Sequence, residues 1–199
     1  MKTVKEKYSK LIEINKSKFI GILFPVESQE DFKMQLNLIN KEWPKATHYC
    51  YAYRLNGMEK SNDDGEPSGT AGRPILEFLK NNDLENVALV VVRYFGGIKL
   101  GAGGLLRAYI DASKAVFEAS DVFLVEEQNV YSLTVDYSLY DILNNYLLKQ
   151  DGQIIKTEYE MKVSIDYLCS SLDEERINNL LNGQVEILSK GKQKVYIKQ

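Results

Sequence analysis

The sequence is poor in the residues that build metal centres and disulfide frameworks. Its 199 residues include one histidine, two cysteines, four prolines and one tryptophan. Because His48 is the single histidine, any site that needs two imidazoles is excluded. Cys50 and Cys169 lie far apart in different contexts, which matches no zinc spacing and no disulfide framework. We therefore expect a reducing, cytoplasmic location.

Long hydrophobic runs are also missing. No apolar run reaches the roughly 18 residues that a membrane span needs. The N-terminus, MKTVKEKYSK, carries cations but no apolar segment of the kind found in secretion signals. The sequence therefore predicts neither a membrane partner nor export.

An excess of positive charge is missing too. The formal net charge is −3, which excludes a uniformly basic nucleic-acid binder. Residues 1–125 carry 17 Lys+Arg against 16 Asp+Glu, whereas residues 126–199 carry 8 against 12. Any site for a polyanion is therefore local, and we expect it in the first part of the chain.

The most informative stretch is residues 88–112, ALVVVRYFGGIKLGAGGLLRAYIDA. A strand pattern, a glycine cluster and a helix from about Gly104 to Ala119 follow one another. This order directs backbone N–H groups and a helix N-terminus toward one point, which is typical of an anion or phosphate-ester site. A tight strand-to-helix connection remains the alternative, because the spacing fits neither common nucleotide motif. The candidate anion- or nucleic-acid-binding residues are Arg93, Gly96, Gly97, Lys99, Gly101, Gly103, Gly104 and Arg107, with Arg73.

Residues 61–74, SNDDGEPSGTAGRP, form a second unusual stretch without periodicity. A loop of this kind in a compact domain is mobile or functional. Asp63, Asp64 and Glu66 offer oxygen ligands for a cation such as Mg²⁺, or an acid/base group assisted by His48. A solvated acidic turn is the alternative, so we name no metal and no cofactor. A short helix is expected from Pro74 to Lys80.

Alternation over residues 47–55 predicts a strand with two different faces. Tyr49, Tyr51 and Tyr53 share one face, while His48 and Cys50 lie on the other. Alternate tyrosines are typical of half-buried sheet packing, and a platform on which bases stack is the alternative. For His48, a structural role and a catalytic role both remain open.

The remaining elements of the first part are simpler. Strands are expected within residues 4–14 and 18–26. Ser28 and Asp31 resemble a capping box that opens a helix ending before Pro44. A strand over residues 122–125 precedes the polar segment 126–129, where we place the domain boundary.

This boundary divides the chain into residues 1–127 and 128–199. The pattern of the second part is βαββαβ, which predicts a ferredoxin-like fold. Its two helices are expected to be capped by Ser138 with Asp141 and by Ser171 with Glu174. This part contains no polar constellation typical of catalysis.

Two segments carry a family resemblance: residues 63–74, DDGEPSGTAGRP, and residues 91–104, VVRYFGGIKLGAGG. Together they resemble the YigZ/IMPACT family, and the resemblance covers the whole chain. It implies an α+β protein with two domains. The first has the left-handed βαβ fold of a ribosomal protein, elongation factor G and the GHMP kinases, and the second is similar to the last domain of elongation factor G.

The resemblance also implies a link to translation, since both structural relatives contact RNA. Eukaryotic IMPACT proteins are translational regulators that bind a protein partner of a stress kinase. Residues 101–106 resemble the phosphate loop of GHMP kinases only loosely, and they lack its paired serines.

Three functional hypotheses follow. The first, which we favour, is a non-enzymatic binding protein that contacts RNA, the ribosome or a translation-associated protein through the cationic glycine-rich loop. The second is a translational regulator that binds proteins without RNA contact. The third is an enzyme acting on a phosphorylated small molecule, but no nucleophile with an adjacent base identifies a reaction.

Overall fold

The chain belongs to the α+β class and forms two compact units, as the sequence predicts. A computed structural model describes residues 1–198. The first unit spans Met1–Leu124 with Ile197 and Lys198, and the second spans Val125–Tyr196. The domain division between residues 127 and 128 stays a prediction, because compactness alone does not define an independently folding domain. Within the described residues, no helix combines the length and apolar content needed to span a membrane.

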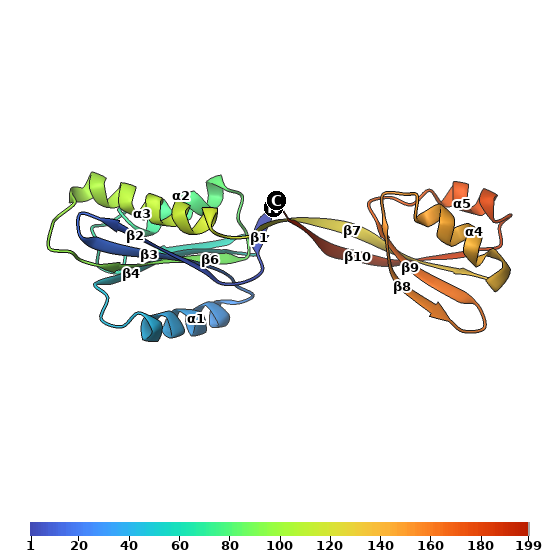
Figure 1. The fold of residues 1–199 in the computed structure, drawn as a ribbon, viewed down its shortest axis with the longest axis horizontal. Helices are drawn as coiled ribbons and strands as arrows, with labels where there is room; N and C mark the ends of the chain where they lie inside the picture. The colour runs from blue at the N-terminus through green and yellow to red at the C-terminus, as the bar shows by residue number, and fades with distance from the viewer. Residues whose placement is uncertain (199) are drawn as a thin grey trace. The chain divides into compact units, whose positions relative to one another are not determined.

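The first unit places an antiparallel sheet between helices. Its elements are β1 (Lys2–Val4), β2 (Tyr8–Ile14), β3 (Ser17–Pro25), α1 (Gln29–Glu42), β4 (His48–Leu55), β5 (Met58–Asn62), α2 (Gly72–Asn81), β6 (Val87–Tyr94) and α3 (Gly101–Glu118). The sheet follows the order β2-β3-β6-β4-β5, and every neighbouring pair is antiparallel. Helices α2 and α3 lie on one face of this sheet, and α1 lies on the other (Figure 1).

The central strand β6 is buried on both faces. Leu89 and Val91 pack in the cluster that includes α2 and α3, whereas Val90 and Val92 pack in the cluster that includes α1. Burial on both faces explains why this strand is a continuous apolar run instead of an alternating one. It also holds Arg93, near the end of the strand, at a fixed position.

Two local predictions for the first unit are confirmed. Ser28 caps α1, because its Oγ accepts a hydrogen bond from the Asp31 amide at 3.0 Å. The alternate tyrosines of β4 are packing residues: the rings of Tyr51 and Tyr53 each lie 4.8 Å from the ring of Phe32 on α1. They are therefore not an open platform for bases.

The second unit has the predicted βαββαβ order. Its elements are β7 (Val122–Val135), whose first three residues belong to the first unit, α4 (Tyr137–Leu147), β8 (Gln153–Tyr159), β9 (Val163–Cys169), α5 (Glu174–Leu180) and β10 (Glu186–Lys198), whose last two residues belong to the first unit. The sheet order β10-β7-β9-β8 is that of a ferredoxin-like fold. Its core includes Leu133, Leu143, Ile165 and Ile177, which come from two strands and both helices.

The predicted end of the strand at Val125 is wrong, because β7 continues through the polar segment Glu126–Asn129. This segment contains neither glycine nor proline, and the residues that precede it and follow it in the chain are both paired in the sheet. Val122–Leu124 pair with β1, and Asn129–Val135 pair with β9. Backbone pairing therefore outweighs the polar composition that indicated an end of the strand.

Both predicted helix caps in the second unit are also wrong. Helix α4 begins after Asp136, two residues before Ser138, and no side-chain hydrogen bond caps it. Helix α5 begins after Asp173, whose carboxylate accepts the Arg176 amide at 3.0 Å. An aspartate occupies the capping position in each case, so the serines that resembled caps are not needed.

Strand β5 was not predicted, and only its last two residues fall in the aperiodic stretch 61–74. All five of its residues are exposed, so it shows no alternation. The sequence signal for this hairpin is Asn56-Gly57, a dipeptide typical of two-residue turns between strands. In the structure both residues have positive φ, and they connect β4 to β5. Helices α2 and α3 also begin earlier than expected, at Gly72 and Gly101.

Candidate functional site

The acidic loop and the glycine-rich loop meet at one cavity of about 460 Å³. The sequence alone does not show that these two segments approach each other. Strand pairing explains why they do: His48 on β4 lies directly opposite Arg93 on β6. The lining includes the ionisable side chains of His48, Glu66, Arg93 and Lys99. It also includes the aromatic ring of Phe95 and Gly101, the first residue of α3.

A buried ion pair forms one wall of this cavity. The Arg93 guanidinium donates through Nη1 to Oε1 of Glu66, and the two side chains are only 6% and 3% exposed. Tyr109 on α3 donates its hydroxyl to the same carboxylate oxygen at 2.8 Å. The charge of Glu66 is therefore neutralised inside the protein, so Glu66 is not part of a solvated acidic turn.

The ion pair extends into a hydrogen-bond network behind the cavity. The Cys50 thiol lies 3.3 Å from the Tyr109 hydroxyl and donates to the Asp63 carbonyl at 2.9 Å. Burial raises the pKa of the Cys50 thiol to about 12 and also raises the pKa of Tyr109. Both groups are therefore neutral hydrogen-bonding partners at physiological pH, and Cys50 is not a nucleophile.

His48 is oriented by the acidic loop. Its Nδ1 lies 2.7 Å from the carbonyl oxygen of Asp64, so this nitrogen carries a proton and donates it. Its Nε2 lies 3.8 Å from Oε1 of Glu66. The backbone thus fixes the imidazole at the cavity wall, with Nε2 on the side of Glu66.

The other two carboxylates of the acidic loop support the loop itself. Asp63 accepts backbone hydrogen bonds from Gly69, Ala71 and Gly72 at 2.8–3.0 Å, and these donors include the first residue of α2. Asp64 accepts the Tyr49 amide at 2.7 Å. Within residues 1–198, no group of three or more His, Cys, Asp or Glu side chains is arranged to hold a metal ion. The magnesium interpretation gains no support from this arrangement.

Asp63 should therefore contribute stability that depends on pH. Burial raises the pKa of its carboxyl, but the three backbone donors outweigh burial and leave the pKa below its usual value. A lowered pKa in the folded state means that the stabilisation is present above the unfolded pKa and is lost as pH falls through the folded pKa.

We expect Asp63→Asn to lower the free energy of unfolding by about 1–2 kcal/mol at pH 7, because asparagine keeps only one acceptor oxygen and removes the charge that strengthens the three backbone hydrogen bonds. The difference from the wild type should shrink as pH falls toward 3. Urea unfolding at both pH values measures it, and a difference that is the same at both would contradict the role of the charge. Asp64→Asn, which alters a carboxylate bound to a single amide, is the control.

The glycines of the loop serve different purposes. Gly97 and Gly101 have positive φ, a conformation that side chains disfavour. Gly96 lies against the backbone at Lys16, where a Cβ would overlap the carbonyl group, whereas Gly103 has open space around its Cα. The glycine cluster is thus partly a packing requirement and partly an uncovered surface at the start of α3.

Two cations predicted for the anion site lie elsewhere. Arg107 is exposed on α3 and does not line the cavity, and Arg73 lines a different depression between α2 and α3. Lys99 lines the cavity and is exposed. Lys99 and the N-terminus of α3 are therefore the positive features that remain available there, since Arg93 is paired.

Phe95 and Tyr109 belong to the site but were not named as site residues. Phe95 is 46% exposed, and the Arg93 guanidinium lies 5.5 Å from its ring centre. Its signal was its position at the end of an apolar strand, where a large exposed ring is unusual. Tyr109 occupies an apolar helix position and packs edge-on against Phe19 at 5.4 Å, so its pattern indicated only core.

Comparisons with known proteins agree with the resemblance. The family described as the Impact N-terminal domain matches residues 15–117, and a domain of unknown function (DUF1949) matches residues 133–184. The IMPACT family member YvyE of Bacillus subtilis (strain 168) is 37% identical over 196 residues, covering 96% of this chain and 87% of its own.

Two further relatives extend this similarity. The IMPACT family member YigZ of Escherichia coli (strain K12) is 34% identical over 153 residues, covering 74% of this chain and 75% of its own. A crystal structure of a hypothetical protein is 28% identical, with a TM-score of 0.60 and coverage of 94% and 95%. On these matches, the chain belongs to the IMPACT family.

Proposed function

We propose that the protein binds RNA of the translation machinery at this cavity. A phosphate would lie near Lys99 and the first amides of α3, and an unstacked base would lie on Phe95. The observation that carries the proposal is the meeting of an exposed cation, a helix N-terminus and an exposed aromatic ring at one cavity.

Electrostatics support an anionic ligand at this place. Glu66 already pairs with Arg93, so Lys99 and the helix dipole are not cancelled by that carboxylate. Nε of Arg93 is buried and has no hydrogen-bond partner among residues 1–198. With a net charge of −3 over the whole chain, attraction is confined to the cavity. Binding should therefore be selective and modest in affinity.

Phe95 supports a nucleic acid over a bare anion. Proteins that hold single strands combine a cationic groove with aromatic rings on which bases stack. The tyrosines of β4 are packed against α1, so Phe95 supplies the exposed ring at this cavity. The family resemblance supports placing this activity on translation, and the cytoplasm would then be its location.

A phosphorylated small molecule is the second candidate ligand. The observation that favours it is the concave cavity with His48 Nε2 and the Glu66 carboxylate at its wall. His48 Nε2 would exchange a proton with a bound ligand, while Glu66 stays paired with Arg93. This candidate predicts binding of a mononucleotide that a longer RNA does not improve.

The test is binding to short single-stranded RNA, measured by fluorescence anisotropy, and co-sedimentation with ribosomes from the source lysate. Phe95→Ala should weaken RNA binding at least about fivefold, because one stacked base contributes about 1–3 kcal/mol. Lys99→Ala should weaken it and reduce the salt dependence by about one phosphate contact. Lys33→Ala, an exposed cation on α1, is the control and should change neither.

If Lys33→Ala weakened RNA binding as much as Lys99→Ala does, the result would contradict a local site. The absence of RNA and ribosome binding in the wild type would overturn the proposal. Binding of a mononucleotide alone would favour the second candidate.

A further inference from the structure

One wall of the cavity contains a guanidinium that is held in place by several neighbours. Nη1 of Arg93 donates to Glu66, and Cζ of Arg93 lies 5.5 Å from the ring centre of Phe95. Glu66 and Phe95 both belong to the lining of the cavity. Cζ also lies 5.4 Å from the ring centre of Phe19. One carboxylate and two aromatic rings therefore hold the guanidinium at the cavity.

This guanidinium has a hydrogen-bond donor that no protein atom accepts. Nε of Arg93 is buried and has no partner among residues 1–198, and the whole side chain is only 6% exposed. Buried N–H groups are almost always paired in proteins. Arginine carries its donors in a rigid fork, and the hydrogen bond to Glu66 uses Nη1 and leaves Nε free. The unpaired Nε points to an acceptor that a ligand supplies.

The start of α3 contributes a second set of donors to the same cavity. Gly101 and Ala102 line the cavity and are the first two residues of the helix, so their amides have no acceptor within it. The capping position holds Leu100, and no side chain caps the helix. Gly101 and Ala102 are exposed, so an oxygen atom can approach their amides. These amides and the positive end of the helix dipole favour an anion.

The third donor is the ammonium group of Lys99, which is exposed and lines the cavity. The lining thus combines three kinds of donor: a buried guanidinium, backbone amides and a flexible cation. A phosphate monoester offers three acceptor oxygens and a charge of about −1.5 to −2 at pH 7. A phosphodiester inside a strand has fewer free oxygens and less charge. The donors of the cavity therefore match a monoester better than a diester.

The depth of Arg93 also favours the end of a strand. An internal phosphate is joined to a nucleotide on both sides, so it cannot enter a cavity as far as a terminal phosphate can. The volume of about 460 Å³ is within the range of pockets that hold one small ligand. The cavity therefore has room for a terminal nucleotide, with the rest of the strand outside.

We infer that the cavity binds the phosphate monoester of a terminal nucleotide and not the internal phosphodiesters of a strand. This inference rests on the proposed function for the place of the ligand, and it adds which chemical group is recognised. One phosphate oxygen accepts from Nε of Arg93, and another accepts from the first amides of α3. The third oxygen lies beside Lys99, and the base of the same nucleotide stacks on Phe95.

The experiment compares RNA ends and requires no change in the protein. Four single-stranded RNAs of one sequence carry a 5′ phosphate, a 3′ phosphate, a 5′ phosphate blocked as its methyl ester, or hydroxyl groups at both ends. Fluorescence anisotropy at neutral pH measures how each competes with a labelled RNA for the full-length protein. At least one phosphorylated RNA should bind about tenfold more tightly than the unphosphorylated one. A 5′ preference should be mostly lost in the methyl ester, which has one free oxygen and some charge less.

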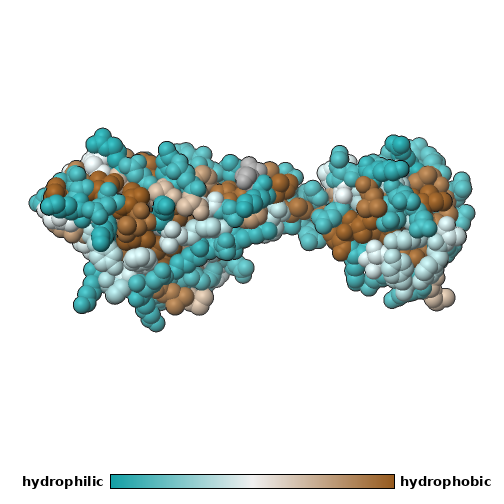
Figure 2. All heavy atoms as spheres, viewed as in Figure 1, coloured by the Kyte–Doolittle hydropathy of each residue, from teal (hydrophilic) through white to brown (hydrophobic). Residues whose placement is uncertain are grey.

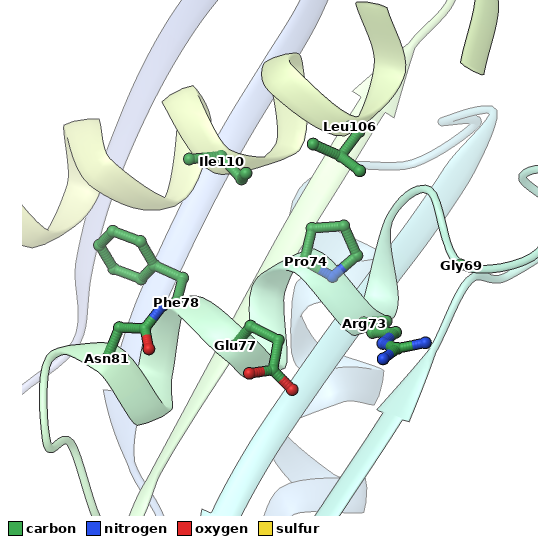
Figure 3. A pocket seen from close by; sticks show the side chains of 8 residues that line it. All are labelled: Gly69, Arg73, Pro74, Glu77, Phe78, Asn81, Leu106 and Ile110. Atoms are coloured by element: carbon green, nitrogen blue, oxygen red, sulfur yellow. The ribbon is translucent and has the colours of Figure 1, made fainter. Parts of the chain in front are cut away.

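Variants then locate the preference for the phosphate. Lys99→Ala should reduce the ratio of the two affinities, phosphorylated over unphosphorylated, by about threefold. Arg73→Ala is the matched control and should leave this ratio unchanged. Arg73 is also an exposed cation, but it lines the depression between α2 and α3 (Figure 3), on a side of the first unit where hydrophobic residues are exposed (Figure 2). Phe95→Ala should weaken both RNAs alike, because its ring contacts the base.

The outcomes separate this inference from the proposed function. If the wild type binds unphosphorylated RNA as tightly as both phosphorylated RNAs, the inference is overturned and RNA binding stands. A methyl ester that binds as tightly as a preferred 5′ phosphate would also overturn it. If a nucleoside monophosphate competes as well as phosphorylated RNA, the inference holds for a small molecule and the proposed RNA function fails. If neither RNA nor a nucleoside monophosphate binds, both fail.

Discussion

Gly96→Ala is expected to destabilise the first unit severely, by about 3 kcal/mol or more. A Cβ at this position would overlap the carbonyl group of Lys16 and the backbone nitrogen of Ser17. Neither neighbour can move easily, because Ser17 begins β3 and its Oγ accepts the Gly96 amide at 3.1 Å. Thermal unfolding should show a fall of about 10 °C, given the usual 2–4 °C per kcal/mol at this size.

Gly103→Ala is the matched control from the same glycine cluster. A Cβ at Gly103 meets no atom within 4 Å, and the residue lies within α3. Alanine is favoured over glycine in a helix by about 1 kcal/mol, so this variant should be as stable as the wild type or more stable. An equal loss in both variants would show that the close approach at Gly96 is not the cause.

Arg93→Ala is expected to have the second large effect, a loss of about 3–5 kcal/mol in the free energy of unfolding. The substitution leaves the Glu66 carboxylate buried without its counter-charge, and the hydrogen bond from Tyr109 compensates only partly. Urea unfolding at neutral pH measures the change. Arg107→Ala removes an exposed arginine from α3 and should change stability by less than about 0.5 kcal/mol.

A double-mutant cycle separates the ion pair from the general cost of truncation. Arg93→Met combined with Glu66→Met should lose clearly less stability than the sum of the two single variants, because no unpaired charge remains. Additive losses would show that the two side chains act independently. Since Arg93 supports the fold, Arg93 variants report poorly on ligand binding, and Lys99 and Phe95 are the better probes.

The sequence predicted the elements whose pattern depends on their own residues. The strand before Arg93 is apolar because both of its faces are covered, and the capping box at Ser28 is satisfied within four residues. The errors lie in elements whose structure is decided by pairing with residues distant in the sequence. Strand β7 crosses a polar segment because β1 and β9 hold its two sides, and β5 is exposed but paired with β4.

The candidate site was predictable in its parts but not in its arrangement. The two unusual loops were identified, yet their meeting depends on the antiparallel register that places His48 opposite Arg93. Glu66 looked like one of three solvated carboxylates, and its burial depends on an arginine 27 residues away. Composition contains no signal for this pairing, because any of the nearby cations would satisfy the same charge balance.

The sheet of the first unit separates two hydrophobic cores and contributes side chains to both. Adjacent residues of β6 face α1 on one side and α2 and α3 on the other. If α1 detached, Val90 and Val92 would be exposed to water, and the strand that positions Val91 for the other core would lose its support. Neither layer can therefore melt alone without weakening the other. This coupling makes the unit cooperative, and the strand that carries Arg93 to the cavity therefore depends on both layers of helices.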